Sequence, residues 1–190
     1  MPGERVIVLK FGGSVLANEA ALGDVVHEIY RWRRDGYQVV AVVSAFYGTT
    51  DRLLAHAAEL CPGAAPETVA AIVSIGECES AAALAAILDR AGTPATACPV
   101  GLNTKLVRTA LERTGVVVIP GFVGHGDAAQ PVVLGRGGSD LTAIYIAAQL
   151  NASCRLVKDV DNLYEHDPKK PGPKPRRFRT ANYTDELKLD

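Results

Sequence analysis

Apolar and polar residues follow one another along this chain in blocks that predict strands and helices in turn. Short, continuous apolar runs have the length of strands that are buried on both faces. They occupy residues 5–10, 37–44, 115–120 and 154–158, with a shorter candidate at 95–99. Apolar residues recur with helical spacing over residues 19–34, 50–60, 67–91, 104–113 and 141–150. This alternation predicts an α/β fold with a parallel-centred sheet and helices on both faces.

Three further segments depart from the alternation. Residues 122–134 predict a β-hairpin with a Gly-His-Gly-Asp turn, and residues 183–189 predict the start of a helix. Gly76 is expected to interrupt the Ala-rich helix at 67–91, because glycine inside a helix costs about 1 kcal/mol relative to alanine. We therefore expect a packing or ligand reason for this glycine.

Composition narrows the class of protein. The chain has 190 residues, 48% of them hydrophobic and 22% charged, with a formal net charge of −1. This profile is typical of a soluble globular protein of one domain or one and a half, and it excludes a broad nucleic-acid or anionic membrane surface. We see no signal peptide and no apolar run of the ~18 residues that a membrane helix needs. A cytoplasmic protein is the expectation.

The cysteines carry little functional signal. Cys61, Cys78, Cys98 and Cys154 form no CxxC pair and no ligand spacing with the four histidines. Neither a metal site nor a disulfide is indicated, and buried reduced thiols are the prediction.

The first strand ends in a candidate anion site. Lys10 is followed by Gly12, Gly13 and Ser14, where backbone amides can approach an anion closely. Lysine as a mobile point charge suits a phosphoryl group in transfer. The alternative is an ordinary strand–helix turn with a surface lysine.

Two more polar clusters follow predicted strands or interrupt helices. Ser44 ends the second strand, and Thr50 precedes a helix that Thr49 or Thr50 could equally well cap. Glu77 lies beside Gly76 in an otherwise apolar helix, where a carboxylate is unexpected. A lone acid on a helix is usually solvated, so both interpretations stay open here.

A fourth cluster lies in the stretch LGRGGSDLTA. Gly135, Gly137 and Gly138 leave the backbone open, and Ser139 or Asp140 could cap the helix predicted from residue 141. Arg136 suits a carboxylate ligand. Asp140 would repel a phosphate unless a magnesium ion or a substrate ammonium lies between them, so the expected ligand carries both signs of charge.

These motifs together resemble a known family. KFGGS, VVSAFYGTTDRLL, SIGECESAAALAAIL, PGFVG, LGRGGSDLTA and KDVDNLYEHDP are similar, in this order, to the successive motifs of aspartate kinases, members of the amino acid kinase family. The resemblance extends from the first strand to about Tyr183. It implies a three-layer α/β/α sandwich with a largely parallel central sheet. It also implies one amino acid kinase domain over residues 1–190, with a substrate-binding part at about 1–134 and the start of a nucleotide-binding part at about 135–190.

The resemblance also implies a reaction. Aspartate kinases transfer the γ-phosphoryl group of ATP, with Mg²⁺, to the side-chain carboxylate of L-aspartate. It further implies amino-acid biosynthesis in the cytoplasm, a homodimer, no nucleic-acid or membrane partner, and fusion to or association with homoserine dehydrogenase as an option. A dinucleotide-binding oxidoreductase is disfavoured, because no GxGxxG follows the first strand.

Roles carry over residue by residue from the resemblance. Lys10 and Asp140 are implied to be catalytic. The residues implied to bind the amino acid are Ser44, Thr50, Glu77, Phe122, Arg136 and Ser139. The residues implied to bind nucleotide or phosphate are Lys10, Gly12, Gly13, Ser14, Gly137, Gly138, Lys158, Asp159 and Tyr164. No protein metal ligand is implied.

Some positions depart from the family pattern. Val15 replaces a hydroxyl residue, Lys158 stands where threonine is usual, and Asn162 replaces a glycine. Residues 101–114 form a shorter segment than is usual.

The chain also stops at Asp190, so we expect a catalytic domain without its C-terminal end and without ACT domains. The alternatives are a catalytically silent ligand-binding or assembly domain and an amino acid kinase with a different small acidic substrate. The Pro-rich basic segment 168–179 is interpreted as a solvated loop, or alternatively as a loop that closes over nucleotide phosphates.

Overall fold

A computed structural model describes residues 5–98, 104–135, 137–158, 163–166 and 170–178. The chain divides into two compact units, residues 1–157 and residues 158–190. Each unit is described by itself below.

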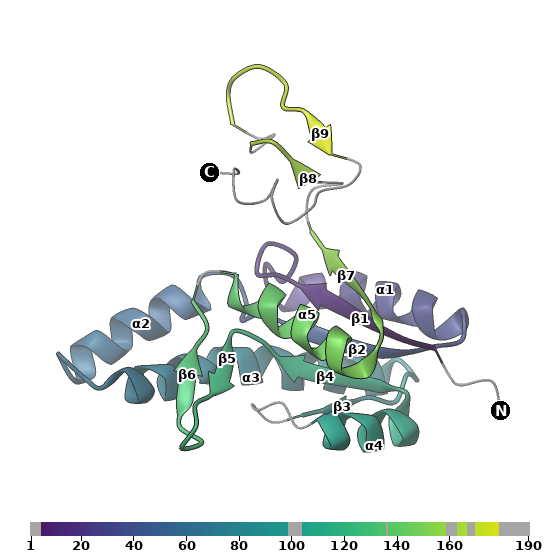
Figure 1. Cartoon of the computed structure of the whole chain (residues 1–190), viewed down its shortest axis with the longest axis horizontal. Helices are drawn as coiled ribbons and strands as arrows, with labels where there is room; N and C mark the ends of the chain where they lie inside the picture. Colours follow the sequence, from purple (N-terminus) through teal and green to yellow (C-terminus); the bar gives the residue numbers. More distant parts are fainter. Residues whose placement is uncertain (1–4, 99–103, 136, 159–162, 167–169, 179–190) are drawn as a thin grey trace. The chain divides into compact units, whose positions relative to one another are not determined.

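The first unit is built on one parallel sheet (Figure 1). Its strands, in spatial order, are β3 (Thr96–Ala97), β4 (Val116–Pro120), β2 (Tyr37–Val43), β1 (Arg5–Phe11) and β7 (Ser153–Val157). Every neighbouring pair is parallel, with Leu9 opposite Ala41 and Ala41 opposite Val118. The parallel sheet predicted from the alternation of strands and helices is confirmed.

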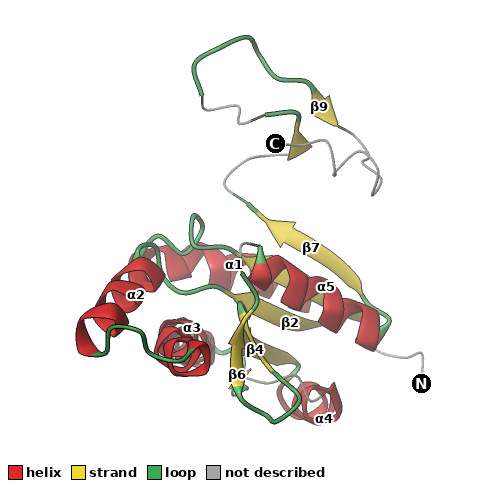
Figure 2. Ribbon diagram, turned by 60° about the vertical axis from the view of Figure 1, so that its left-hand side comes forward, coloured by secondary structure: helices red, strands yellow, loops and turns green. Residues whose placement is uncertain are grey.

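Helices cover both faces of this sheet, and Figure 2 shows α3 and α4 on opposite sides of it. The helices of the unit are α1 (Leu22–Arg34), preceded by the short 3₁₀ turn η1 (Glu19–Ala21), then α2 (Thr49–Leu60), α3 (Pro66–Arg90), α4 (Thr104–Thr114) and α5 (Gly138–Leu150). Side chains of successive strand residues point to opposite faces. Leu9 and Ala41 therefore pack with α1 and α3, while Val8 and Val40 pack with α4 and α5. The three-layer α/β/α sandwich is confirmed.

Two smaller sheets complete the described residues. The predicted hairpin is present as β5 (Val123–His125) and β6 (Pro131–Val133), but its loop begins at Gly126, later than the Gly-His-Gly-Asp motif suggests. In the second unit, β8 (Leu163–Tyr164) pairs with β9 (Arg177–Phe178). Strand β9 lies within the segment interpreted as a loop. The predicted helix at 183–189 lies outside the described residues.

Helix α3 differs from two expectations, a break at Gly76 and the absence of any segment long and apolar enough to span a membrane. It continues without a break through Gly76, because this glycine is needed for space rather than to end the helix. A Cβ atom there would lie 2.8 Å from Thr49 Cγ2 and 3.1 Å from Leu53 Cδ1. By length and composition α3 could span a membrane, contrary to the expectation that no segment could. Its apolar composition is explained by packing, since residues such as Leu84 and Leu88 are fully buried in the core.

Helix starts and cysteines also differ from expectation. Helix α5 begins at Gly138, three residues before the predicted start, and α2 begins at Thr49. Each follows a glycine with positive φ, Gly137 or Gly48, and neither has a side-chain cap. Capping by Ser139, Asp140, Thr49 or Thr50 was therefore a wrong prediction. No disulfide joins the four cysteines, but Cys61 and Cys154 are exposed rather than buried.

Candidate active site

The polar clusters meet at the carboxyl ends of the central strands. Strand β1 leads into Gly12, β2 leads into Ser44 and β4 leads into Gly121. The strands are parallel and adjacent, so these three ends lie at the same edge of the sheet. Backbone hydrogen bonds continue past the strands, from Ser44 N–H to Phe11 O at 3.1 Å and from Gly121 N–H to Val43 O at 2.9 Å.

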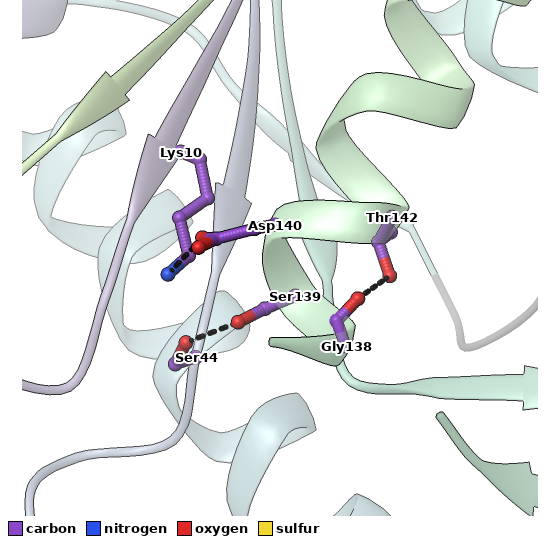
Figure 3. A network of polar contacts seen from close by, with 6 residues as sticks. All are labelled: Lys10, Ser44, Gly138, Ser139, Asp140 and Thr142. Atoms are coloured by element: carbon purple, nitrogen blue, oxygen red, sulfur yellow. Dashed lines mark hydrogen bonds and ion pairs between the residues drawn. The ribbon is translucent and has the colours of Figure 1, made fainter. Parts of the chain in front are cut away.

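The start of α5 packs directly against these strand ends. A Cβ atom on Gly121 would lie 2.7 Å from Ser139 Cβ, so only glycine allows this approach. The Ser139 hydroxyl lies 2.9 Å from the Ser44 hydroxyl (Figure 3). The first turn of α5 is tightened further by Thr142, whose hydroxyl donates to Gly138 O at 2.9 Å. The positive end of α5 therefore faces the same edge as the strand ends.

A pocket of about 280 Å³ opens at this edge. Seven of the residues that the sequence predicts for the site line it: Gly13, Ser14, Ser44, Thr50, Glu77, Phe122 and Ser139. Five other residues line it that the sequence did not single out individually for the site: Ala45, Phe46, Tyr47, Gly48 and Asp51. Four of them, residues 45–48, fill the interval between Ser44 and α2, and Asp51 lies in the first turn of that helix.

Phe122 has an unusual backbone at the pocket wall. Its φ of 67° lies in the left-handed region, which costs a non-glycine residue about 1 kcal/mol or more. Its ring packs near Gly138, where an added Cβ would lie 3.1 Å from Phe122 Cδ2. The strained turn therefore places an aromatic side chain between the end of β4 and the start of α5.

Glu77 is the most perturbed titratable group of the site. Only 2% of it is exposed, and its Oε2 atom has no hydrogen-bond partner among the described residues. Burial raises the pKa of the Glu77 carboxyl from 4.5 to about 8, although the Ala45 backbone amide and the Lys10 charge both act in the opposite direction. The pocket wall thus contains a buried carboxyl group whose Oε2 atom has no donor among the described residues.

Lys10 and Asp140 form an ion pair beside the pocket. The Lys10 Nζ lies 2.5 Å from Asp140 Oδ1, and their side chains are 6% and 28% exposed. Figure 3 shows the two side chains reaching toward each other from β1 and from the first turn of α5. Lys10 gives Asp140 a cationic partner within the protein, and the expected magnesium ion or substrate ammonium beside Asp140 stays a prediction. Lys10 also runs past Gly12, where an added Cβ would lie 3.0 Å from Nζ.

The remaining predicted residues are not brought into the pocket by the described structure. Gly137 and Gly138 lie at the start of α5 but do not line the pocket. Lys158 and Tyr164 belong to the second unit. Arg136 and Asp159 lie outside the described residues. Within the described part of the chain, no group of three or more His, Cys, Asp or Glu side chains could hold a metal ion.

Comparisons with known proteins agree with this architecture. Residues 5–189 match the model of the amino acid kinase family. The aspartokinase of Helicobacter pylori is 35% identical over 182 residues, which cover 86% of this chain and 45% of that protein. The chain thus spans about half the length of the curated relatives it matches.

Solved structures show the same fold. The aspartate kinase of Synechocystis superimposes with a TM-score of 0.74 at 30% identity, covering 86% of this chain and 30% of that one. Aspartokinase III of Escherichia coli, in complex with aspartate and ADP, gives a TM-score of 0.70 at 22% identity, covering 87% of this chain and 52% of that one. From the match of its sequence over nearly its full length, and from its fold, the chain belongs to the amino acid kinase family.

Proposed function

We propose that this protein transfers the γ-phosphoryl group of ATP to the side-chain carboxylate of L-aspartate, giving 4-phospho-L-aspartate. The observation that carries the proposal is the buried Glu77 carboxyl in the pocket wall, with Oε2 unpartnered among the described residues. A substrate ammonium would supply both the missing donor and the missing charge. A substrate with an amino group and a carboxylate therefore suits the pocket better than a simple anion.

The other pocket residues fit the same ligand. Ser44, Thr50 and Ser139 offer hydroxyl groups and Phe122 an apolar wall, and we assign all four to substrate binding. Arg136 would hold the α-carboxylate through a bidentate contact. The aspartokinase names of relatives at 35% identity support aspartate as the acceptor.

The nucleotide is assigned to a second set of residues. Gly12, Gly13 and Ser14 follow β1, and Gly137 and Gly138 open α5, so their amides suit phosphate oxygens. Lys158, Asp159 and Tyr164 would hold the rest of the nucleotide. Magnesium prefers phosphate, water and one or two carboxylates, so it would be held mainly by the nucleotide, with Asp140 as the nearby carboxylate. When bound, it would reduce the negative charge of the phosphates.

The proposed step needs no general base. A carboxylate with an ordinary pKa of about 3.9 is already a nucleophile at neutral pH. One of its oxygens attacks the γ-phosphorus in line, the bond to the β-phosphate oxygen breaks, and ADP leaves with that electron pair. The barrier is the repulsion between two anions, so positioning and positive charge are the protein's main contributions.

Lys10 is the side chain proposed to supply this charge. Its ammonium group has three donors, and the ion pair with Asp140 orients the group at the edge where β1 meets α5. A positive charge held at this edge is suited to the transferring phosphoryl group. Asp140 thus acts by holding Lys10 as well as by facing the ligand.

The proposal is tested with the full 190-residue chain. Isothermal titration measures the binding of L-aspartate, L-glutamate, succinate and MgATP, and a hydroxamate assay detects acyl phosphate. We expect L-aspartate to bind best and acyl phosphate to form. Lys10→Met is expected to reduce product formation at least about 100-fold while changing the aspartate Kd less than about threefold. Failure of the wild-type chain to bind aspartate contradicts the proposal.

A silent ligand-binding domain is the second candidate. It is favoured by the pocket itself, whose lining residues all lie within residues 1–157, so that a small ligand could bind there without the second unit. Binding of aspartate and MgATP without acyl phosphate would support this candidate. A preference for another acidic ligand in the titrations would instead indicate a different substrate within the family.

A further inference from the structure

We infer that Ser80 is a positioning residue, whose hydroxyl ties α3 to the end of β2 and holds the Glu77 carboxyl where the substrate ammonium binds. The inference rests on the proposed function, because it assigns Ser80 a part in recognising an amino acid. It concerns a side chain that does not line the pocket.

The first support is the hydrogen bonding of Ser80. The residue is fully buried, and its hydroxyl is shared between Ser44 O at 2.8 Å and Glu77 O at 3.0 Å. The bond to Glu77 O lies within α3, whereas the bond to Ser44 O joins α3 to the residue that follows β2. Ser80 therefore links the helix that carries Glu77 to the strand end that carries Ser44.

The second support is a bond in the opposite direction. The Ala45 backbone amide donates to the Glu77 carboxyl and lowers the pKa of that group against the larger effect of burial. Ser44 and Ala45 thus contact α3 twice, once as acceptor from Ser80 and once as donor to Glu77. The Ser80 bond holds Ser44 against α3, and the neighbouring Ala45 amide then acts on the Glu77 carboxyl.

The third support is the close approach of the two backbones. A Cβ atom on Gly76 would lie 3.2 Å from Ala45 Cβ, so glycine allows α3 to lie against the end of β2. Steric fit brings the elements together, and Ser80 sets their alignment. Loss of the hydroxyl leaves the half-buried Ser44 carbonyl without this donor and lets the Ser44–Ala45 segment shift relative to Glu77.

Ser74 provides a matched control on the same helix. Its hydroxyl donates to Ala71 O at 2.7 Å, three residues earlier, just as Ser80 donates to Glu77 O. The Ser74 bond stays within α3. Ser74→Ala and Ser80→Ala therefore remove the same kind of helix bond, but only Ser80→Ala removes the link to β2.

The experiment compares L-aspartate with succinate, which lacks the amino group, in the wild-type protein and both variants. Ser80→Ala is expected to weaken aspartate binding roughly three- to tenfold and succinate binding less than about twofold. Ser74→Ala is expected to change neither. A role that is only structural would lower the melting temperature and weaken both ligands equally. An unchanged ratio of the two Kd values in Ser80→Ala overturns the inference.

Amide hydrogen exchange of Ala45 provides a readout that needs no ligand. Faster exchange in Ser80→Ala than in Ser74→Ala is expected, and equal rates overturn the inference. Failure of the wild-type protein to bind aspartate would contradict the proposed function, while the exchange rates would still judge the link between α3 and β2. If Ser80→Ala does not fold, Ser80→Cys keeps a polar group of the same connectivity with a larger atom and a weaker donor, and the same change in ratio, smaller in size, is expected.

Discussion

At the scale of single residues, Glu77 is where burial and charge oppose each other most strongly. The carboxyl group is 2% exposed, and its pKa is raised to about 8 chiefly by burial. The folded protein therefore holds the proton over a pH range in which the unfolded chain, with a pKa near 4.5, has lost it. Two predictions follow from this difference.

The first prediction concerns stability and pH. Because the folded state binds more protons between pH 4.5 and about 8, the Glu77 contribution is fully present below pH 4.5 and is lost as pH rises through about 8. The loss is on the order of 2 to 5 kcal/mol in the free energy of unfolding. Glu77→Gln should remove this slope, so that denaturant unfolding from pH 5 to 8.5 gives a flatter curve than the wild type. Parallel curves for the two proteins would contradict the assignment.

The second prediction concerns ligand binding. A substrate ammonium near Glu77 favours the ionised carboxyl, so aspartate binding below about pH 8 should release a proton. Titrations at pH 6.5 in buffers of different ionisation enthalpy should show a release approaching one proton per aspartate. Glu77→Gln should bind aspartate more weakly and release far less. Buffer-independent heats in the wild type would argue against Glu77 as the ammonium partner.

The sequence pattern predicted where Glu77 lies, but it did not predict that the carboxyl group is buried and has a raised pKa. A carboxylate among alanines and leucines is visible in the sequence, but its burial depends on elements distant along the chain that pack against α3. The Lys10–Asp140 pair was also beyond sequence reasoning. The two residues are 130 positions apart, and only the parallel sheet brings β1 next to the start of α5.

At the scale of elements, glycines decide how closely helices and strands approach. Gly76 lies where α3 meets α2 and the end of β2. Gly76→Ala gains about 1 kcal/mol in helix propensity. It also forces a Cβ within 2.8 Å of Thr49 Cγ2 and 3.1 Å of Leu53 Cδ1, and such overpacking costs about 1 to 3 kcal/mol.

The third prediction is therefore that Gly76→Ala lowers the free energy of unfolding by up to about 2 kcal/mol and weakens aspartate binding. Gly23→Ala is the control, because Gly23 lies in α1 and a Cβ there meets nothing within 4 Å. That variant should be as stable as the wild type or up to about 1 kcal/mol more stable. Urea unfolding of both variants measures the difference, and equal effects would rule out the steric role of Gly76.

Element types followed from the sequence because their apolar periods are clear, but element ends did not. The buried strands β1, β2 and β4 lie within one or two residues of their predicted ranges. The start of α5 was missed by three residues, since a glycine-rich segment gives no apolar period from which to read it. The uninterrupted α3 shows the same limit. A glycine that weakens a helix locally can be required by a neighbour that is distant in sequence.

At the scale of the whole molecule, the pocket and part of the proposed nucleotide set belong to different units. All the pocket residues lie within residues 1–157, whereas Lys158 and Tyr164 lie within residues 158–190. The α/β/α architecture was predictable from the order of strands and helices alone. The division after Val157 was not, and the functional boundary near residue 134 stays a prediction.

The fourth prediction uses this division. Lys158→Ala and Tyr164→Phe should weaken MgATP binding about three- to tenfold, as expected for loss of a contact with a charged ligand. Both should leave the Kd for aspartate alone within about twofold, because neither residue lines the pocket. Separate titrations with each ligand provide the measurement. A selective loss of aspartate binding in either variant would contradict this assignment.

The pairing of Lys10 with Asp140 also affects how strongly this edge of the sheet attracts simple anions. With an opposite charge 2.5 Å from the ammonium, a bare phosphate or chloride ion finds little uncompensated attraction there. A ligand that carries its own cation can pair that cation with Asp140, and its anionic group can then contact Lys10. We therefore expect simple anions to bind weakly at this edge, and ligands that carry both signs of charge to bind more tightly.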